Sequence, residues 1–474
     1  MEIQHLRIGG KTLQGTAGTR KVLDPYDLSI VGEVSYGDRA QASDAIDAAR
    51  SAFKQFKSSA AYQRAEVLRK ASELIAARKD ELATLITRES GKPILAARLE
   101  VERAVFTFRS AAEAAARAHE GEVLDMTVTR SGAQRSGSFR YFPIGVVLAI
   151  TPFNYPLNLV AHKVAPAIAS GNTVVLKPAP QTPLTAFMLA DIMQEAGLPP
   201  GVLNVITCDN EVAETMVRDE RIAMLSFTGS DTVGWKLKSI AGRAKVALEL
   251  GGNGFVIVHD TDDLDRTIDV LARGAFNYAG QICISVQNLL VRREMYDEVV
   301  RAMVASAESI SVGDPKLEDT VVGPMISEAA AKKVEQWIED AEASGAKRLT
   351  GDLQLPNVLT PTVLTDVPHD STIYQHEAFA PVVIIEAYDS IEEAIEIVNA
   401  STFGLQAGLF TNDMRVIQTA YEKLDVGGLI VNDSNAFRLD TMPYGGVKSS
   451  GFGREGILFA MREMSEIKML VLKS

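Results

Sequence analysis

The chain has 474 residues, of which 46% are hydrophobic and 23% are charged, a composition typical of a globular protein with room for two or three domains. Its net charge of −13 provides no basic footprint for nucleic acid and disfavours an anionic membrane surface, so neither partner is expected. Two cysteines and six scattered histidines form no disulfide framework and no metal-binding spacing, which predicts a reducing, cytoplasmic compartment and no metal site. We also expect no signal peptide and no membrane span, because no apolar run has the required length.

The first part of the chain is predicted to be mainly helical. After a short strand-like arm, amphipathic helices are expected at residues 41–57, 62–90 and 93–119. Residues 126–140 are predicted to form a projecting β-hairpin, and residues 467–472 a C-terminal strand. A lone hairpin is marginal in water and a terminal strand leaves an open edge, so we expect the two to cover each other or to pack on another subunit.

From residue 144 onward, short apolar strands alternate with helices, which predicts parallel sheets covered on both faces. The first series of strands is expected at residues 144–150, 173–176, 202–206, 222–227 and 246–248, with helices at 158–170 and 185–195. The second is expected at 255–258, 286–291, 382–386, 408–410 and 428–431, with helices at 264–275, 295–310, 328–342 and 391–399. The change of series near Gly251 and Gly252 indicates a boundary between two α/β domains, the first shaped like a nucleotide-binding fold.

Cys283 lies in residues 276–285, between a helical pattern and a strand, at the kind of junction that commonly carries functional residues. Gly280 and the small residues near it leave room for a substrate to approach, and a thiol becomes a nucleophile where its surroundings favour the thiolate. The alternative is a buried cysteine acting as a small hydrophobic residue, the more common use of a lone cysteine.

Two motifs at the ends of predicted strands suit a phosphate-containing ligand. Phe-Thr-Gly-Ser at residues 227–230, followed by Gly234, lies where a strand gives way to a helix, whose free N–H groups and positive end attract phosphate. Lys177 follows another parallel strand, at the edge where open α/β sheets bind ligands. The alternatives are an ordinary Ser-capped helix start and a solvated lysine.

Asn154 and Glu249 are candidates for acyl chemistry. The two prolines of Thr-Pro-Phe-Asn-Tyr-Pro at residues 151–156 predict a rigid loop from which the Asn154 amide can donate to a developing oxyanion. Glu249 stands between two leucines in an apolar strand, so it needs a partner or carries a raised pKa suited to a general base. The alternatives are a turn-forming asparagine and a structural ion pair.

Over nearly its whole length the chain resembles the aldehyde dehydrogenase superfamily, because seven motifs occur in that family's order and spacing. They are Thr-Pro-Phe-Asn-Tyr-Pro at 151–156, Thr-Val-Val-Leu-Lys-Pro at 173–178, Phe-Thr-Gly-Ser at 227–230, Leu-Glu-Leu-Gly-Gly at 248–252, Gly-Gln-Ile-Cys at 280–283, Glu-Ala-Phe-Ala-Pro at 377–381 and Pro-Tyr-Gly-Gly-Val-Lys at 443–448. The resemblance implies an α/β fold with a Rossmann-like NAD(P)-binding domain (1–122 and 142–249) and a catalytic α/β domain (250–449). A β-hairpin and C-terminal strand (123–141 and 450–474) would join subunits into homodimers or homotetramers.

By this resemblance, Cys283 attacks the aldehyde carbonyl to give a thiohemiacetal, whose oxyanion is held by the Asn154 side-chain amide and the Cys283 backbone N–H. Hydride transfer to the nicotinamide leaves a thioester, and Glu249 acts as general base for the water that hydrolyses it. Lys177 would bind the adenosine ribose, Ser230 the pyrophosphate and Glu377 the nicotinamide ribose. The other residues expected to contact the cofactor are Ile150, Thr151, Pro152, Phe153, Pro180, Gly229, Val233, Leu250, Gly251 and Phe379.

Pro180 departs from the family pattern, since many NAD-dependent members have a glutamate there that binds the adenosine ribose hydroxyls and repels a 2′-phosphate. Proline removes that barrier to NADP without supplying a cation, so NAD and NADP are expected equally as cofactors. Residues 207–211 lack the glycines usual beside the adenine, and Cys208 is interpreted as a structural residue.

The substrate entrance is inferred by correspondence with the family. It would be lined by Tyr155, Leu159, His162, Ile282, Ile284, Arg438 and Tyr444. A guanidinium in a tunnel favours a carboxylate, sulfonate, phosphate or hydroxylated tail; the alternative for Arg438 is an ion pair with Asp433 or Asp440.

Two segments, 280–285 and 432–438, resemble one branch of the family. That branch contains lactaldehyde dehydrogenases, non-phosphorylating glyceraldehyde-3-phosphate dehydrogenases and sulfolactaldehyde dehydrogenases. Phosphate-binding members often carry an arginine next to the cysteine, where this chain has Ile282. Small polar or singly charged aldehydes, such as lactaldehyde or a semialdehyde, are therefore the expected substrates.

Two other functions remain open. A CoA-acylating dehydrogenase generally lacks a base at the position of Glu249, and a non-catalytic structural relative would have lost the nucleophile or the cofactor groups. Because Cys283, Asn154, Lys177 and Glu377 are all present, a hydrolytic NAD(P)-dependent enzyme is the favoured prediction.

Overall fold

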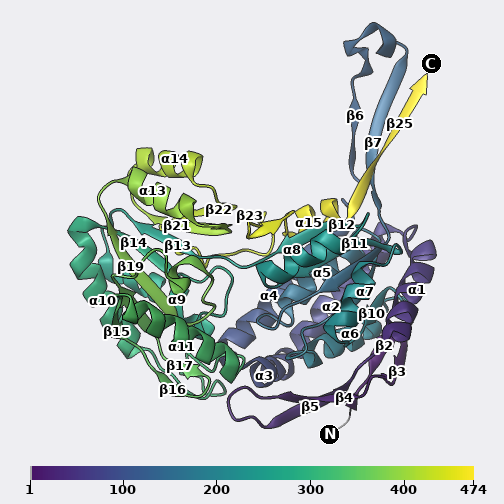
Figure 1. The fold of residues 1–474 in the computed structure, drawn as a ribbon. Helices are drawn as coiled ribbons and strands as arrows, with labels where there is room; N and C mark the ends of the chain where they lie inside the picture. Colours follow the sequence, from purple (N-terminus) through teal and green to yellow (C-terminus); the bar gives the residue numbers. More distant parts are fainter. Residues whose placement is uncertain (1–2, 474) are drawn as a thin grey trace.

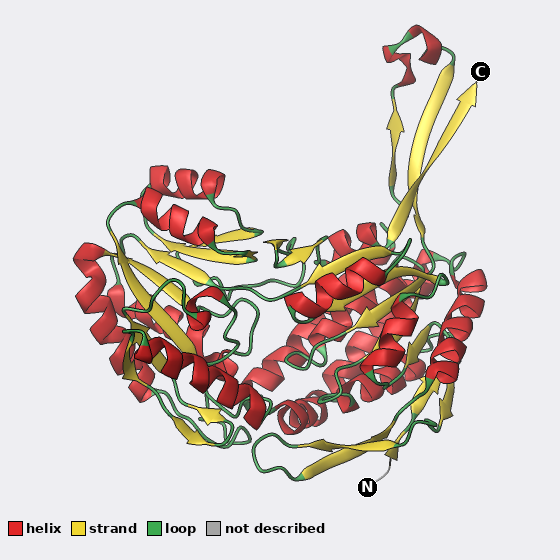
Figure 2. Cartoon of the chain, in the orientation of Figure 1, coloured by secondary structure: helices red, strands yellow, loops and turns green. Residues whose placement is uncertain are grey.

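The computed structural model describes residues 3–473; Met1, Glu2 and Ser474, which the predicted domains include, lie outside the described residues. Two α/β lobes, each built on its own sheet, stand side by side, and a three-stranded arm projects from one of them (Figure 1). Figure 2 shows helices packed around both sheets, which confirms the predicted α/β class. No helix within residues 3–473 is both long and apolar enough to cross a membrane.

The first lobe is organised around an eight-stranded sheet whose five central strands are parallel. In spatial order the strands are β24 (Gly451–Phe452), β12 (Lys245–Glu249), β11 (Ile222–Thr228), β8 (Val146–Ile150), β9 (Thr173–Lys177), β10 (Leu203–Val205), β2 (Leu6–Ile8) and β3 (Lys11–Leu13). β9 and β10 extend the sheet on one side of β8, and β11 and β12 extend it on the other, so the strand order reverses between β8 and β11. Open α/β sheets bind ligands at such a switch point, outside the carboxyl ends of the strands.

Helices cover both faces of this sheet, and their apolar side chains form two buried clusters with it. All five residues of β8 are buried, which explains why the strand is a continuous apolar run. The helices are α1 (Arg39–Phe56), α2 (Ala61–Ala77), α3 (Lys79–Ser90), α4 (Ile94–Ala115), α5 (Asn158–Ala169), α6 (Leu184–Glu195), α7 (Asn210–Val217), α8 (Asp231–Ile240) and α15 (Ile457–Glu463).

The single helix predicted over residues 62–90 is wrong, because α2 and α3 are separate helices that meet at Arg78. Arg78 has φ −107° and ψ 24°, outside the helical range, and Asp80 and Glu81 follow in the first turn of α3, where acidic residues complement the positive helix end. Apolar periodicity alone did not reveal the break, because both helices contribute buried residues to the same core cluster.

The second lobe contains a seven-stranded sheet that is parallel except for one edge strand. In spatial order its strands are β15 (Lys347–Thr350), β18 (Thr362–Thr365), β19 (Val382–Tyr388), β14 (Asn288–Arg292), β13 (Phe255–Val258), β21 (Gln406–Phe410) and β22 (Gly428–Val431). Its helices are α9 (Leu264–Phe276), α10 (Tyr296–Ser309), α11 (Glu328–Ala343), α12 (Thr372–Gln375), α13 (Ile391–Ala400) and α14 (Met414–Lys423). The sequence analysis missed α14, although Val416, Ile417, Ala420 and Leu424 recur at helical spacing and pack in one cluster.

Shorter strands complete the lobes. They are β1 (Ile3–Gln4), β4 (Thr19–Leu23) and β5 (Ile30–Ser35) in a three-stranded sheet, β16 (Leu353–Leu355) with β17 (Val358–Leu359), and β20 (Phe403–Gly404) with β23 (Val447–Lys448).

The projecting arm consists of β6 (Gly121–Leu124), β7 (Arg135–Pro143) and the C-terminal β25 (Ser465–Lys473), in the order β25-β7-β6 (Figure 1). The predicted hairpin is present, but its first strand lies upstream of the expected position, since Met126–Val128 form a 3-10 turn. Asp125 accepts a hydrogen bond from the Thr127 N–H (2.8 Å), which caps that turn in place of a strand. β25 pairs with β7 along its whole length, so the hairpin covers one edge of the terminal strand.

Candidate active site

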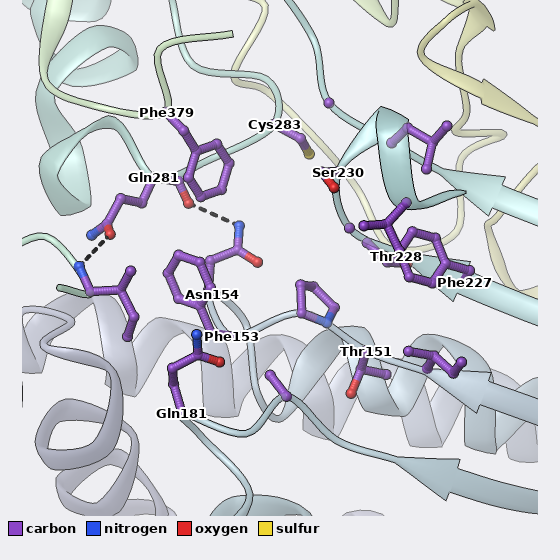
Figure 3. A pocket seen from close by; sticks show the side chains of 18 of the residues that line it. Thr151, Phe153, Asn154, Gln181, Phe227, Thr228, Ser230, Gln281, Cys283 and Phe379 are labelled. Carbon is purple, nitrogen blue, oxygen red and sulfur yellow. Dashed lines mark hydrogen bonds between the residues drawn. The ribbon is translucent and has the colours of Figure 1, made fainter. Parts of the chain in front are cut away.

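Two cavities meet at Cys283. The larger, of about 590 Å³, lies at the carboxyl ends of β8, β9, β11 and β12. The second, of about 450 Å³ and called the entrance cavity below, shares Cys283, Asn154 and Leu159 with it. Figure 3 shows Cys283 on one wall of the larger cavity and Thr151, Phe153 and Asn154, from the loop after β8, on another. Ligands in the two cavities can therefore both reach the sulfur.

The segment before Cys283 has an unusual backbone. Tyr278, Ala279 and Gly280 all have positive φ, at 53°, 52° and 64°. Gly280 is required for space as well, because a Cβ there would lie 2.0 Å from the Ala380 carbonyl oxygen. Three left-handed residues in succession are costly, and such strain persists where the surrounding structure holds it, most often at functional sites.

Cys283 is half-buried, and its Sγ lies 2.9 Å from the Tyr444 hydroxyl. Burial raises the pKa of the Cys283 thiol to about 11, against the hydrogen bond from Tyr444 and the charge of Arg438, which both lower it. The thiolate is therefore favoured by Tyr444 and Arg438 and opposed by desolvation and by the carboxylates of Glu377 and Glu249.

Asn154 is buried and fixed by one hydrogen bond, in which Nδ2 donates to the Gln281 carbonyl (2.8 Å; dashed line in Figure 3). Its Oδ1 has no hydrogen-bond partner within the described chain. An amide nitrogen carries two hydrogens, so Nδ2 keeps one for a ligand in the cavity. The loop after β8 thus holds a polar group in both of the cavities that Cys283 lines.

Glu249, the last residue of β12, is a buried carboxylate with neither oxygen hydrogen-bonded to the residues of 3–473. Burial raises its pKa well above the usual value, and the neighbouring carboxylate of Glu455 adds to the shift. Glu455 itself accepts hydrogen bonds from Lys163 (3.1 Å) and Arg438 (3.0 Å). Within the described residues, Glu249 therefore does not form the structural ion pair that was the alternative to a general base.

The larger cavity suits a long ligand with phosphates and hydroxyls. All thirteen residues predicted to contact the cofactor line it, and its volume falls in the range of cofactor sites. Glu377 accepts a hydrogen bond from the Gly252 N–H (3.1 Å), and burial raises its pKa to about 8. A Cβ at Gly251 would lie 2.2 Å from the Glu377 carboxylate, so glycine is needed for the carboxylate to lie here.

The phosphate-binding signals occur at the other strand ends of this cavity. Ser230 is the N-cap of α8, yet its side chain makes no capping hydrogen bond, so the Ser-capped alternative does not hold. Lys177 is buried rather than solvated, and burial lowers its pKa. A cation, a hydroxyl and a helix N-terminus are the groups that bind a pyrophosphate, so these residues fit a nicotinamide dinucleotide.

The entrance cavity is lined by six of the seven predicted residues, Tyr155, Leu159, Ile282, Ile284, Arg438 and Tyr444. The prediction for His162 is wrong in position. Its ring is fully buried on α5, where Nε2 lies 2.8 Å from Asp440, and it does not line the cavity. Helical spacing explains the error, because only some residues of α5 face the cavity.

Arg438 is buried, but its partner is not Asp433 or Asp440 as the ion-pair alternative expected. Its guanidinium donates to Glu455 and lies 3.7 Å from the centre of the Tyr444 ring, and its Nε is buried without a hydrogen-bond partner in the described chain. Asp440 instead pairs with Arg103 (2.7 Å). Arg438 is thus anchored by an ion pair and still has donor capacity in the cavity.

Arg103 was missed, because α4 looked like scaffold. It lines the entrance cavity and donates to both oxygens of Asp440. A signal was present at Glu100, a buried acidic residue on the apolar face of α4, one turn before Arg103. Charged residues on the buried stripe of a helix need partners or a ligand.

Cys208 lines neither of the two cavities. Cys208 is buried and free, and burial raises its pKa to about 11. Among residues 3–473, no three His, Cys, Asp or Glu side chains are grouped as metal ligands.

Comparison with known proteins shows the following. Residues 13–470 match the aldehyde dehydrogenase family. The chain is 44% identical to the 3-sulfolactaldehyde dehydrogenase of Priestia aryabhattai, over 96% of this chain and 95% of that protein. Aldehyde dehydrogenase 21 from Physcomitrella patens, solved with its reaction product succinate, superposes with a TM-score of 0.98 at 42% identity, covering 100% and 98% of the two chains. The glyceraldehyde-3-phosphate dehydrogenase of Methanocaldococcus jannaschii, solved with NADP, superposes with a TM-score of 0.91 at 40% identity, covering 96% and 99%.

Proposed function

The chain belongs to the aldehyde dehydrogenase family, and on this premise we propose that it oxidises small anionic aldehydes to carboxylates with NAD(P)+, using Cys283 as the nucleophile. The predicted class, an NAD(P)-dependent aldehyde dehydrogenase, is confirmed by the family match and by the relative solved with NADP. One observation gives the strongest support for this assignment of the active site. The thiol lies where two cavities meet, with the unpaired carboxylate of Glu249 on one side and two guanidinium groups on the other.

The first chemical step belongs to Cys283 and Asn154. The thiolate attacks the aldehyde carbon, a C–S bond forms, and the C=O electron pair moves onto the oxygen. The free N–H of the Asn154 amide and the Cys283 backbone N–H donate to that oxygen, which stabilises its charge. When bound, NAD(P)+ would supply the acceptor for the hydride of the thiohemiacetal carbon. As that hydride leaves, the oxyanion's electron pair re-forms the C=O bond and Cys283 is left as a thioester.

The second step belongs to Glu249. Its carboxylate accepts a proton from a water molecule, the resulting hydroxide attacks the thioester carbon, and the Sγ leaves as thiolate. The raised pKa of Glu249 suits this role, because a base whose pKa is nearer neutrality takes a proton from water more readily. A CoA-acylating enzyme does not need this base, and a non-catalytic relative needs neither residue, so both alternatives are disfavoured.

We assign binding of the cofactor to the larger cavity. Lys177 and Ser230 would hold its adenosine ribose and pyrophosphate, and Glu377 the nicotinamide ribose. The proposed division gives residues 1–122 and 142–249 to the cofactor and 250–449 to catalysis. Of the segments 123–141 and 450–474 predicted for oligomerisation, the second begins with β24 and α15, which belong to the first lobe, so β25 is the part of it that joins the hairpin in the arm. Exposed apolar side chains on β25, among them Ile467, Leu470 and Leu472, favour a homodimer or homotetramer joined through the arm, and we place the enzyme in the cytoplasm.

The charge of residue 180 is expected to control the choice between NADP and NAD. Pro180 is exposed and lines the cofactor cavity. In Pro180→Glu, a carboxylate would repel a 2′-phosphate, so the KM for NADP+ should rise about tenfold or more while the KM for NAD+ stays or falls. Initial rates with both cofactors measure this, and Pro180→Gln is the control of equal length without charge. If glutamine has the same effect as glutamate, shape rather than charge decides.

The proposed substrate class rests on Arg103 and Arg438, which both line the entrance cavity. Each already has a carboxylate partner, yet a guanidinium has five N–H donors and can bind a second anion. The relatives named above support this, because sulfolactaldehyde, succinate and glyceraldehyde 3-phosphate all carry an anionic group.

Replacing either arginine is therefore expected to lower kcat/KM more for anionic aldehydes than for neutral ones. In Arg103→Met, kcat/KM for succinate semialdehyde should fall tenfold to about a hundredfold, the usual value of a charge-assisted hydrogen bond, while kcat/KM for neutral lactaldehyde changes only a few-fold. Arg438→Met also removes a charge that favours the Cys283 thiolate, so kcat/KM should fall for both aldehydes, and for the anionic one by about tenfold or more beyond the neutral one. Arg273→Met is the matched control, because Arg273 lines the same cavity but is exposed and paired with Asp269. Equal losses with both aldehydes would make the two arginines structural ion-pair partners.

A further inference from the structure

We propose that Tyr444 is a catalytic residue, whose phenol O–H donates a hydrogen bond to the Cys283 thiolate and so increases the fraction of nucleophile that is ionised. The inference rests on the proposed role of Cys283. It gives Tyr444 a part in the chemistry, beyond lining the entrance for the substrate.

The contact is held in place from several sides. The Tyr444 hydroxyl lies 2.9 Å from Sγ, and the tyrosine is 3% exposed. Its backbone forms a two-way bridge with Glu455, in which Tyr444 N donates to Glu455 O (3.1 Å) and Glu455 N donates to Tyr444 O (2.7 Å). The guanidinium of Arg438 lies over the ring, and Ile284 and Leu405 pack against it. Because the ring cannot move away without breaking this packing, its hydroxyl remains directed at the sulfur.

The direction of the hydrogen bond follows from the two titrations. Burial raises the pKa of Tyr444 well above its usual value, so the phenol keeps its proton while the thiol ionises. When the thiol loses its proton to solvent, the sulfur can only accept, and the phenol becomes the donor. A hydrogen bond from a neutral donor to an ionised acceptor is stronger than one between neutral groups, so it stabilises the thiolate more than the thiol.

The environment of Sγ makes this contribution important. The charged groups that face the sulfur are Arg438, which favours the thiolate, and Glu249 and Glu377, which oppose it together with desolvation. Within residues 3–473, no second hydrogen bond to Sγ accompanies the one from Tyr444. Loss of the phenol oxygen would leave only the guanidinium to favour the charged form.

The effect is confined to the free thiolate. When Sγ bonds to the aldehyde carbon, its negative charge passes to the carbonyl oxygen, which faces Asn154, and the hydrogen bond from Tyr444 loses its ionic partner. A more stable thiolate is a somewhat weaker nucleophile, but below the thiol pKa the gain in thiolate fraction exceeds that loss. Tyr444 therefore acts before attack, by setting how much nucleophile is available.

The experiment measures the pH dependence of Cys283 alkylation by iodoacetamide in the full-length enzyme, followed by mass spectrometry of the Cys283 peptide. Tyr444→Phe removes only the oxygen and keeps the ring under Arg438. The control is Tyr388→Phe, because Tyr388 is a second fully buried tyrosine that lines neither cavity and has no hydrogen bond to Sγ. Cofactor titration by fluorescence verifies that each variant is folded, since the cofactor cavity does not include either tyrosine.

We expect Tyr444→Phe to raise the apparent pKa of Cys283 by about one unit, and thus to lower the alkylation rate about tenfold at pH values below it. At high pH the two rates should converge, and Tyr388→Phe should keep the wild-type profile. An unchanged profile in Tyr444→Phe overturns the inference, and so does an equal shift in both variants. Aldehyde oxidation that survives in Cys283→Ser would instead contradict the proposed function itself, so the two failures are distinguishable.

Discussion

Cys283→Ser is expected to reduce NAD(P)H formation from any aldehyde by roughly four orders of magnitude or more, since a covalent mechanism loses nearly all its rate with its nucleophile. A serine hydroxyl ionises far less readily than a thiol. Neither oxygen of Glu249 is hydrogen-bonded within the described chain, and the hydrogen-bond partner of Sγ is the Tyr444 phenol, which is too weak a base to activate a hydroxyl. Stopped-flow measurement should show loss of both the burst and the steady rate.

Cys208→Ser is the matched control, because it makes the same change at a buried cysteine that lines neither cavity. It should keep the burst and nearly the wild-type steady rate. Cofactor affinity, measured by fluorescence titration, should be unchanged in Cys283→Ser, since one altered atom at the end of the cavity leaves Lys177, Ser230 and Glu377 in place. Oxidation that continues at the wild-type rate in Cys283→Ser would exclude the mechanism.

The strand ends were the part of the site most accessible to prediction. Lys177 and Glu249 end mainly apolar strands and Ser230 follows another, and the carboxyl ends of parallel strands meet at one edge of a sheet. Residues far apart in the sequence could thus be assigned to one cavity without knowing how the helices pack.

Contacts between distant elements were not accessible in this way. Arg438 pairs with Glu455 rather than with the nearer Asp433 or Asp440, and Glu455 also holds Lys163, which lies 292 positions away in the chain. Periodicity indicates which face of a helix or strand is buried, but it does not indicate which other element packs against that face. Arg103 was overlooked for the same reason, because its role depends on how α4 packs beside the loop that carries Asp440.

Local competition for hydrogen bonds explains the errors within elements. Residues 127–129 have high strand propensity, yet Asp125 caps a turn there and β6 begins earlier. Such choices are decided by single side chains, so apolar pattern alone does not predict them.

Glu249→Gln is expected to separate the two halves of the reaction. Thiolate attack and hydride transfer do not need the carboxylate, so a burst of NAD(P)H close to one equivalent per active site should persist. The steady rate should fall by about two to three orders of magnitude, because no base remains to activate the deacylating water.

The pH dependence gives a second, independent readout of the same role. The active form of Glu249 is the carboxylate, and burial raises its pKa, so the wild-type steady rate should increase as the pH rises through that value. The steady rate of Glu249→Gln should not show this increase with pH. Hydroxylamine, which attacks a thioester without help from a base, should restore turnover in the variant. If the burst disappears together with the steady rate, Glu249 acts before the thioester forms, and its assignment as deacylation base is wrong.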